Sequence, residues 1–237
     1  LASYLFYRTT GWKPYRGGVF TFQFGRFHVA TGRGDLGTIG EIFIDRLHQV
    51  QDFIPSDGDT CVDVGAHIGC VALQWRLTNR TGRIIAVEPH PRTVEVLRAN
   101  CALNPGADVT VVAAAVGSRE GPLEMILDAN ENRMALTAGD HLRYTGAFAA
   151  QQRHAVPGIT LDSLVATQGV RHVHLLKIDV EGYEVECLKG GAKTLGMTDR
   201  IIVEVHSTPL KTECARILTG HGFSFHITGN LMFAKRM

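Results

Sequence analysis

The feature that most constrains this chain is a regular alternation of short apolar runs and helical patterns from residue 60 to the C-terminus. Such alternation is typical of strand–helix units, which build a parallel sheet covered by helices. Residues Cys61–Val64 read as a strand, and a glycine-containing turn joins them to a helix from Gly69 to about Leu77. The sequence therefore predicts an α/β fold.

The same alternation predicts the remaining elements. We expect helices from Pro91 to the stop signal Asn104-Pro105-Gly106 and at Leu161–Ala166, Tyr183–Gly190 and Pro209–Gly220. We expect strands at Arg83–Val87, Val109–Val116, Leu123–Leu127, Val173–Asp179, Ile201–His206, Phe223–Ile227 and Leu231–Ala234. Turn residues 117–121 predict a β-hairpin between the second and third of these strands, and residues 228–230 predict one between the last two.

Two segments depart from this pattern. Residues 1–58 form an N-terminal extension with short strands and one amphipathic helix near Ile39–Phe53, and we expect them to belong to the same domain as residues 59–237. Residues 128–155 have no clear periodicity. Because long loops of this kind often contact substrates, we expect 128–155 to be a substrate loop.

Composition excludes several classes of protein. The chain has 24 basic and 23 acidic residues, and adjacent basic residues occur only at Lys235-Arg236, so we expect no nucleic-acid partner. The longest apolar run, Val111–Val116, is far too short to span a membrane. The five cysteines are odd in number and lack metal-site or redox spacing, which favours reduced thiols in a cytoplasmic protein. The sequence does not determine the oligomeric state.

The strongest motif is Val-Asp-Val-Gly-Ala-His-Ile-Gly at residues 62–69. Gly65 allows a sharp turn, and Gly69 allows the helix to approach the strand closely. The dinucleotide motif G-x-G-x-x-G does not fit, because His67 and Cys70 stand where glycines belong. Since a pyrophosphate needs the missing middle glycine, the motif favours a cofactor without pyrophosphate.

Glu88 follows the second predicted strand. A carboxylate at this position can accept hydrogen bonds from both hydroxyls of a ribose. The alternative is a solvated side chain at the end of a strand. The glycine turn and the acid occur together in one strand–helix–strand unit, which favours the ribose interpretation.

These residues resemble the class I S-adenosylmethionine-dependent methyltransferases and, more narrowly, the FkbM family. The resemblance rests on residues 62–69, Ala115-Val116-Gly117, Thr160–Leu164, Leu176–Gly182 and Glu204-Val205-His206, and it extends from about residue 35 to the C-terminus. It implies a Rossmann-like fold with a seven-stranded, mostly parallel sheet, one antiparallel strand and helices on both faces. One departure is His67, where the family usually carries Asn.

The resemblance also implies where S-adenosylmethionine lies, namely over the carboxyl ends of the strands. The implied contacts are Asp63, Gly65 and His67, with Ala66 and Gly69 of the same turn, around the methionine portion; Glu88 at the ribose; Pro89 and Ala115 at the adenine; Asp179 near the sulfonium; and Glu41 at the amino-acid end.

Methyl transfer is an in-line displacement at an activated carbon, so an enzyme mainly positions the reactants and removes a proton from the acceptor. Alternate residues of a strand share a face, which groups Lys177 with Asp179 and Glu204 with His206. If the two strands are neighbours, all four side chains converge at the carboxyl edge of the sheet. We expect His206 to be the general base, because imidazole titrates nearest neutral pH.

Other interpretations of these residues stay open. His206 is also explained as a strand-end or surface histidine. Lys177 either orients the acceptor or forms a structural ion pair with Asp179 or Glu181. Three carboxylates and a histidine could hold Mg²⁺, but nothing in their spacing requires it, and we expect no metal.

The predicted function is S-adenosylmethionine-dependent methyl transfer, with O-methylation of a hydroxyl on a sugar, a polyketide or another small molecule of secondary metabolism, as the resemblance implies. One alternative is a nicotinamide-dependent oxidoreductase. Another is a non-catalytic S-adenosylmethionine-binding module. The sequence does not identify the acceptor.

Overall fold

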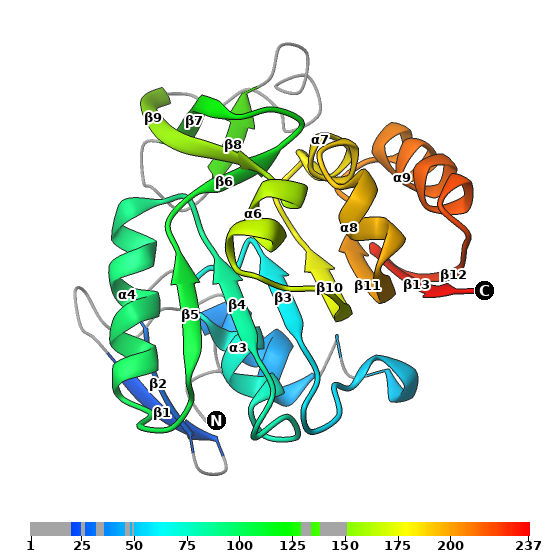
Figure 1. Cartoon of the computed structure of the whole chain (residues 1–237). Helices are drawn as coiled ribbons and strands as arrows, with labels where there is room; N and C mark the ends of the chain where they lie inside the picture. Colours follow the sequence, from blue (N-terminus) through cyan, green and yellow to red (C-terminus); the bar gives the residue numbers. More distant parts are fainter. Residues whose placement is uncertain are drawn as a thin grey trace.

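The computed structural model describes residues 20–24, 27–31, 36–45, 48, 50–128, 134–137 and 151–237. Its central sheet contains the strands β3 (Cys61–Val64), β4 (Ile84–Val87), β5 (Val109–Val112), β10 (Val173–Ile178), β11 (Thr198–Glu204), β12 (Phe223–Thr228) and β13 (Leu231–Arg236). These seven strands have the order β12-β13-β11-β10-β3-β4-β5 (Figure 1). Strand β13 is antiparallel to both neighbours, and the other pairings are parallel. This confirms the predicted seven-stranded sheet with one antiparallel strand.

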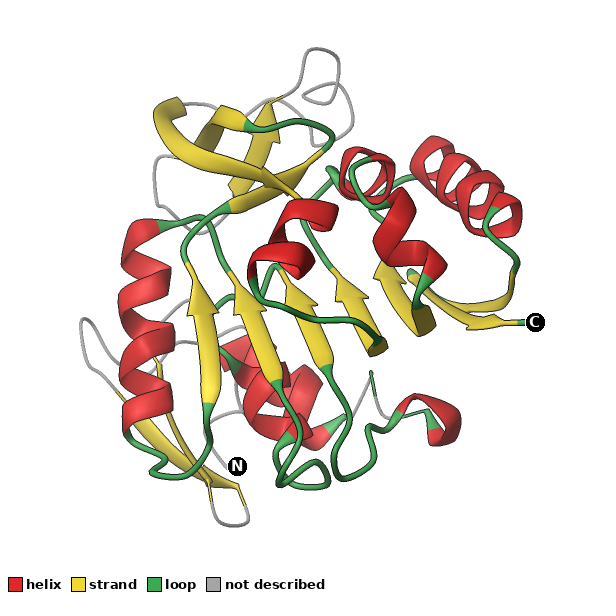
Figure 2. Cartoon of the chain, viewed as in Figure 1, coloured by secondary structure: helices red, strands yellow, loops and turns green. Residues whose placement is uncertain are grey.

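Helices cover both faces of this sheet (Figure 2). They are α3 (Cys70–Trp75), α4 (Pro91–Ala102), α6 (Leu161–Thr167), α7 (Glu184–Lys189), α8 (Ala192–Gly196) and α9 (Thr208–Gly220). Side chains alternate across each strand, so Val62 and Val64 of β3 pack with α6, α7 and α9, whereas Cys61 packs with α3 and α4. The sequence did not predict α8.

The helix starts follow ordinary capping chemistry. His90 precedes α4, and its imidazole accepts a hydrogen bond from the backbone N–H of Thr93, while Pro91 occupies the first turn. Ser207 caps α9 in the same way. Within α4 the buried side chains Val94 and Leu97 form the stripe that packs on the sheet.

The N-terminal region contains the hairpin strands β1 (Phe20–Phe24) and β2 (Phe27–Thr31) and the short helices α2 (Leu36–Ile39), η1 (Gly40–Ile44, a π-helix) and η2 (Gln51–Phe53, a 3₁₀-helix). The single helix expected near Ile39–Phe53 is therefore wrong, since Val50 is extended. The apolar spacing resembled that of one helix because Ile39, Ile42 and Phe53 all pack in the same hydrophobic cluster, although they come from separate helical turns. Residues 1–19 lie outside the described residues.

A second sheet contains β6 (Ala115–Gly117), β7 (Gly121–Asp128), β8 (Met134–Thr137) and β9 (Gln151–Thr160) in the order β6-β9-β7-β8. It lies beyond the carboxyl ends of β3, β4 and β5 (Figure 1). The strand predicted at Val109–Val116 is thus two strands in different sheets. The hairpin predicted between that strand and Leu123–Leu127 is also wrong, because β7 pairs with β8 and β9.

Part of the segment expected to lack periodicity, residues 128–155, consists of β8 and the start of β9. Residues 129–133 and 138–150 lie outside the described residues. The turn predicted at residues 228–230 is confirmed, because Thr228 pairs with Leu231 across the β12–β13 hairpin. No helix in the described ranges is long and apolar enough to cross a bilayer.

Candidate functional site

The turn after β3 brings segments that are distant in sequence into contact. Gly65 has a φ of 77°, and a Cβ built there would lie 1.7 Å from the carbonyl oxygen of Asp179. Gly69 has a φ of 90°, and its Cβ would lie 2.5 Å from Leu97 Cδ1 of α4. Both positions therefore require glycine, the first for the approach of β3 to β10 and the second for the packing of α3 on α4.

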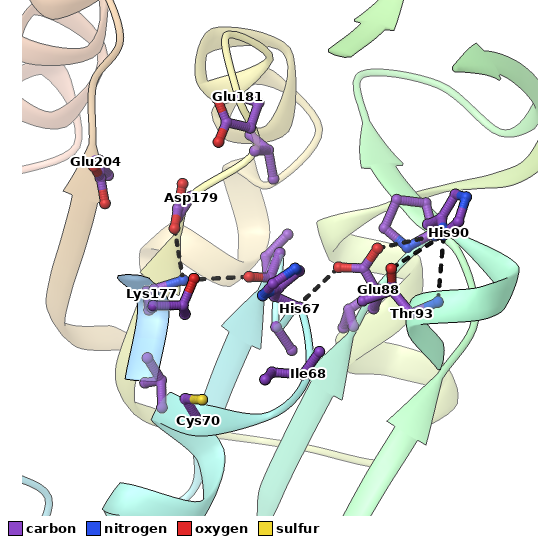
Figure 3. Close-up of a pocket in the computed structure, with 18 of the residues that line it drawn as sticks. His67, Ile68, Cys70, Glu88, His90, Thr93, Lys177, Asp179, Glu181 and Glu204 are labelled. Atoms are coloured by element: carbon purple, nitrogen blue, oxygen red, sulfur yellow. Dashed lines mark hydrogen bonds and ion pairs between the residues drawn. The ribbon is translucent and has the colours of Figure 1, made fainter. Parts of the chain in front are cut away.

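A cavity of about 400 Å³ opens at the carboxyl ends of β3, β4 and β10 (Figure 3). The predicted site residues that line it are Glu41, Gly65, Ala66, His67, Glu88, Pro89, Ala115, Lys177, Asp179 and Glu204. Three others lie outside its lining, namely Asp63, Gly69 and His206. The volume falls within the range of small-molecule sites, roughly 300–1,000 Å³.

Glu88 is only 2% exposed, and each of its carboxylate oxygens accepts one backbone hydrogen bond. The N–H of His67 donates to Oε2 at 3.0 Å, and the N–H of His90 donates to Oε1 at 2.9 Å (Figure 3). Burial raises the pKa of Glu88 to about 7. Each oxygen retains a further lone pair, so the carboxylate can accept two adjacent hydroxyl groups.

Lys177 is buried beneath the turn and holds β3 against β10. Its Nζ lies 3.3 Å from Asp63 Oδ1 and 3.3 Å from Asp179 Oδ2, and it donates to the carbonyl of Gly65 at 3.3 Å. Burial alone would lower the pKa of Lys177, but Asp63, Asp179 and Glu204 hold it above its usual range. Burial raises the pKa of Asp63. Asp179 and the carbonyl of Gly65 accept hydrogen bonds from the ammonium group, and Asp63 adds an ion pair.

His206 lies just after β11, which is the neighbour of β10, as its predicted convergence with Asp179 requires. Its Nδ1 is 2.8 Å from Glu184 Oε1, and its Nε2 lies 3.5 Å from Glu181 Oε2 and 3.9 Å from Asp179 Oδ1. Burial would lower the pKa of His206, but the bond to Glu184 and the surrounding acids raise it to about 9. The imidazole is therefore protonated at neutral pH in this structure.

Sequence reasoning missed two residues of this region. Glu184 is fully buried and orients His206, and its signal was present, because it ends the Lys-Ile-Asp-Val-Glu-Gly-Tyr-Glu segment that begins at Lys177. His48 is buried and lines the cavity, yet no pattern in the N-terminal extension marks it. Its pKa falls to about 4, chiefly through burial.

The charges around the cavity suit a cationic ligand. Asp179, Glu181 and Glu204 line its wall, and Lys177 is the one buried cation that the described residues place among them. Burial and the neighbouring Asp179 raise the pKa of Glu204 to about 7. Ligand atoms of Asp179, Glu181 and His206 also lie within 4.8 Å of one another. The expected absence of a metal stays a prediction.

Comparison with known proteins identifies the family. Residues 63–225 match the family model described as the methyltransferase FkbM domain. The chain belongs to the FkbM methyltransferase family. Its cofactor is S-adenosylmethionine, which has no pyrophosphate, and this agrees with the missing middle glycine of the turn. The nicotinamide alternative is therefore set aside. The match includes Glu88, Asp179 and His206, but it begins after Glu41 and His48.

Individual relatives are distant. The hexuronic acid methyltransferase AglP of Haloferax volcanii is 27% identical over 172 residues, which are 73% of this chain and 66% of that protein, just under two thirds of its length. The 31-O-demethyl-FK506 methyltransferase FkbM of Streptomyces tacrolimicus is 28% identical over 231 residues, covering 87% of this chain and 88% of that protein. Among solved structures, Aeropyrum pernix fibrillarin with bound S-adenosyl-L-methionine is 14% identical with a TM-score of 0.49, covering 94% and 85% of the two chains.

The cavity fits S-adenosylmethionine on three counts. The buried carboxylate of Glu88 offers two acceptor oxygens for ribose hydroxyls. Gly65 lines the cavity and has no side chain to occupy it. The acids Asp179, Glu181 and Glu204 face a cavity that would hold the positive sulfonium and ammonium groups.

Proposed function

We propose that this FkbM-family protein transfers a methyl group from S-adenosylmethionine to a hydroxyl oxygen of a small metabolite, such as a sugar or a polyketide. The bound donor supplies a methyl carbon made electrophilic by its sulfonium. A hydroxyl acceptor must lose its proton, and the pairing of His206 with Glu184 beside Asp179 is the observation that carries the proposal. The names of the two relatives, which specify a hexuronic acid and 31-O-demethyl-FK506, support it.

His206 is the proposed general base. Glu184 fixes the imidazole by accepting the N–H at Nδ1, so that the neutral ring directs the lone pair of Nε2 toward Asp179 and Glu181. A pKa of about 9 keeps the ring protonated before the donor binds. A sulfonium placed near Asp179 adds positive charge, which lowers the pKa of His206 toward neutrality and releases the basic form.

The other predicted site residues have supporting roles in this proposal. Glu88, Pro89, Ala115, Ala66 and His67 surround the nucleoside, whereas Asp63, Gly65, Gly69 and Lys177 shape the turn beneath it. Glu41 and Glu204 contact the donor's ammonium or the acceptor. We further propose that residues 128–155 contact the acceptor, and that residues 1–58 complete the domain formed by 59–237.

The proposal includes a small-molecule acceptor and no nucleic acid. All five cysteines are free thiols, which supports the cytoplasmic location proposed from the sequence. A phosphate-tracking basic stripe is absent from the sequence, which has a formal net charge of +1.

The test is product identification with an isotopically labelled methyl donor. The enzyme is incubated with cell extracts, hexuronic acids and macrolides, and labelled products are assigned by mass spectrometry and NMR. We expect the label on an oxygen. A label on nitrogen or carbon would overturn the O-methylation, and donor binding without any labelled product would favour the non-catalytic module.

The base assignment is tested with His206→Gln, which keeps a polar side chain without a titratable nitrogen. We expect turnover to fall about 10²- to 10⁴-fold without a loss of donor affinity, because the substitution removes a cation that lies near the proposed sulfonium position. His172→Gln is the matched control, because His172 is exposed and its contacts with Asp199 and His174 lie outside the cavity lining. Unchanged turnover in His206→Gln would rule out this histidine as the base.

A further inference from the structure

His48 is a buried histidine with an unusual lack of partners. It is 5% exposed, and within the described part of the chain neither imidazole nitrogen has a hydrogen-bond partner. It lies between η1 and η2 and lines the cavity. Native proteins rarely leave buried polar atoms unsatisfied, because each such atom destabilises the fold. The position and the missing partners together indicate that a ligand satisfies this side chain.

The electrostatics place His48 at a particular end of the cavity. The charges of Lys177 and Asp179 both act on its pKa, in opposite directions, so His48 lies near this pair. Figure 3 shows Lys177 and Asp179 on one side of His67 and Glu88 on the other. With the ribose at Glu88, a methionine portion directed past His67 would reach the part of the lining that contains Lys177, Asp179 and His48.

The donor's amino-acid portion carries an ammonium group and a carboxylate, and the cavity lining favours the first over the second. Glu41, Asp179 and Glu204 line the cavity, and their carboxylates attract an ammonium group but repel a carboxylate. Lys177 does not readily compensate, because its charge is already shared by the ion pairs with Asp63 and Asp179 and it donates to the carbonyl of Gly65. The α-carboxylate therefore needs another N–H donor.

We propose that His48 binds the α-carboxylate of S-adenosylmethionine through an imidazole N–H. A neutral imidazole carries one N–H donor and one acceptor nitrogen, and burial keeps this ring neutral near pH 7, with its pKa lowered to about 4. The bond would satisfy a nitrogen that is otherwise orphaned and would fix the methyl donor at its amino-acid end. This inference rests on donor binding as proposed above.

The experiment compares two nucleosides by isothermal titration calorimetry. S-adenosylhomocysteine carries the amino-acid end, whereas 5′-methylthioadenosine lacks it. In His48→Leu we expect S-adenosylhomocysteine to bind about 10- to 100-fold more weakly, as loss of a hydrogen bond to a charged group implies. The affinity for 5′-methylthioadenosine should stay within about twofold, because that ligand lacks the α-carboxylate that His48 is proposed to bind.

Two further measurements separate binding from a structural role. The melting temperature of ligand-free His48→Leu should not fall below that of the wild type, because the substitution removes two unsatisfied nitrogens and keeps an apolar side chain. His48→Gln retains an N–H donor and should recover part of the lost affinity. His172→Leu, an exposed substitution, serves as the control and should bind both nucleosides normally.

The outcomes are distinct. Unchanged affinity for S-adenosylhomocysteine in His48→Leu overturns the proposal. An equal loss for both nucleosides also overturns it, since His48 would then shape the cavity as a whole. A lower melting temperature of the ligand-free variant would show that His48 has a structural partner, which contradicts the premise. A wild-type protein that binds neither nucleoside would refute the proposed function together with this inference.

Discussion

Replacing Glu88 by Gln should separate the two consequences of burying this carboxylate. The substitution keeps the size and shape of the side chain, but it removes the charge and converts one acceptor oxygen into an NH₂ donor. Glu88 is 2% exposed and accepts backbone hydrogen bonds from His67 and His90. The variant should therefore bind the donor less tightly and should change how stability depends on pH.

The stability effect follows from the pKa of Glu88, which burial raises from 4.5 to about 7. A raised pKa means that the folded protein holds the proton more tightly than the unfolded chain does. The resulting stabilisation is complete below the unfolded pKa and is lost as pH rises through about 7. Between pH 5 and pH 8 the free energy of unfolding of the wild type should fall by about 2–3 kcal/mol, as a pKa shift of this size implies. The free energy of unfolding of Glu88→Gln should not show this fall.

The binding effect follows from the acceptor oxygens. Glu88→Gln loses one charged acceptor for a ribose hydroxyl, so the affinity for S-adenosylhomocysteine at pH 8 should fall about 10- to 100-fold. Wild-type affinity should also weaken below about pH 7, as Glu88 becomes protonated. That part of the pH dependence should be absent in the variant.

Urea denaturation at pH 5 and pH 8 and calorimetric titration with S-adenosylhomocysteine measure the two effects. Glu95→Gln is the matched control, because Glu95 is exposed on α4 and lies outside the cavity lining. An affinity of Glu88→Gln within about twofold of the wild type would refute the ribose contact. Equal pH dependence of stability in Glu88→Gln and the wild type would refute the raised pKa.

Three further predictions concern the turn and the proposed base. Gly65→Ala should abolish folding or donor binding, because its Cβ would lie 1.7 Å from a carbonyl oxygen; circular dichroism and calorimetry check this. Lys177→Met should lower the free energy of unfolding, measured by urea denaturation, by about 3–5 kcal/mol. Combining Lys177→Met with Asp63→Leu should restore part of this free energy, since no unpaired charge then remains at residue 63. Glu184→Gln should lower the pKa of His206 from about 9 in an NMR titration. In the wild type, the stability that this pair lends should be complete below the usual pKa of His206, 6.5, and lost as pH rises through about 9. An unchanged His206 pKa in Glu184→Gln would contradict the contact between these two residues. A double variant no more stable than Lys177→Met would contradict the ion pair between Lys177 and Asp63.

The sequence predicted the central sheet well because each strand carries its own signal. Cys61–Val64 is a short apolar run bounded by a glycine turn, and the structure has β3 at these residues. The helix starting at Pro91 was marked by its proline and by the stop signal at residues 104–106, and α4 begins there. The family resemblance then supplied the number of strands in the sheet and its one antiparallel strand, which local patterns do not contain.

The same local reasoning failed where an apolar run continued past the end of a strand. Val109–Val116 reads as one apolar strand, but the chain leaves the central sheet after Val112 and enters a second sheet at Ala115. Both halves remain apolar because both pack against other elements, so hydropathy gave no sign of the division. The partners of β6 and β7 are set by β9, which follows more than 20 residues after β7.

The site also contains some residues that local sequence predicts and others that only the tertiary structure reveals. Glu88 and Asp179 were readable, because each follows a strand whose carboxyl end faces the cavity. Glu184 was readable in principle from the motif that contains it. His48 was not, because its role depends on a cavity assembled from segments more than 100 residues apart.

The sequence alone determined the chemistry available to this protein: a glycine turn without a pyrophosphate motif, an acid at the next strand end, and a family motif of methyltransferases. Tertiary structure decided the states of these groups. Burial raises the pKa of Glu88 to about 7 and lowers that of His48 to about 4, while the contact with Glu184 raises that of His206 to about 9. Desolvation and contacts between distant residues set these pKa values, and neither is a property of local sequence.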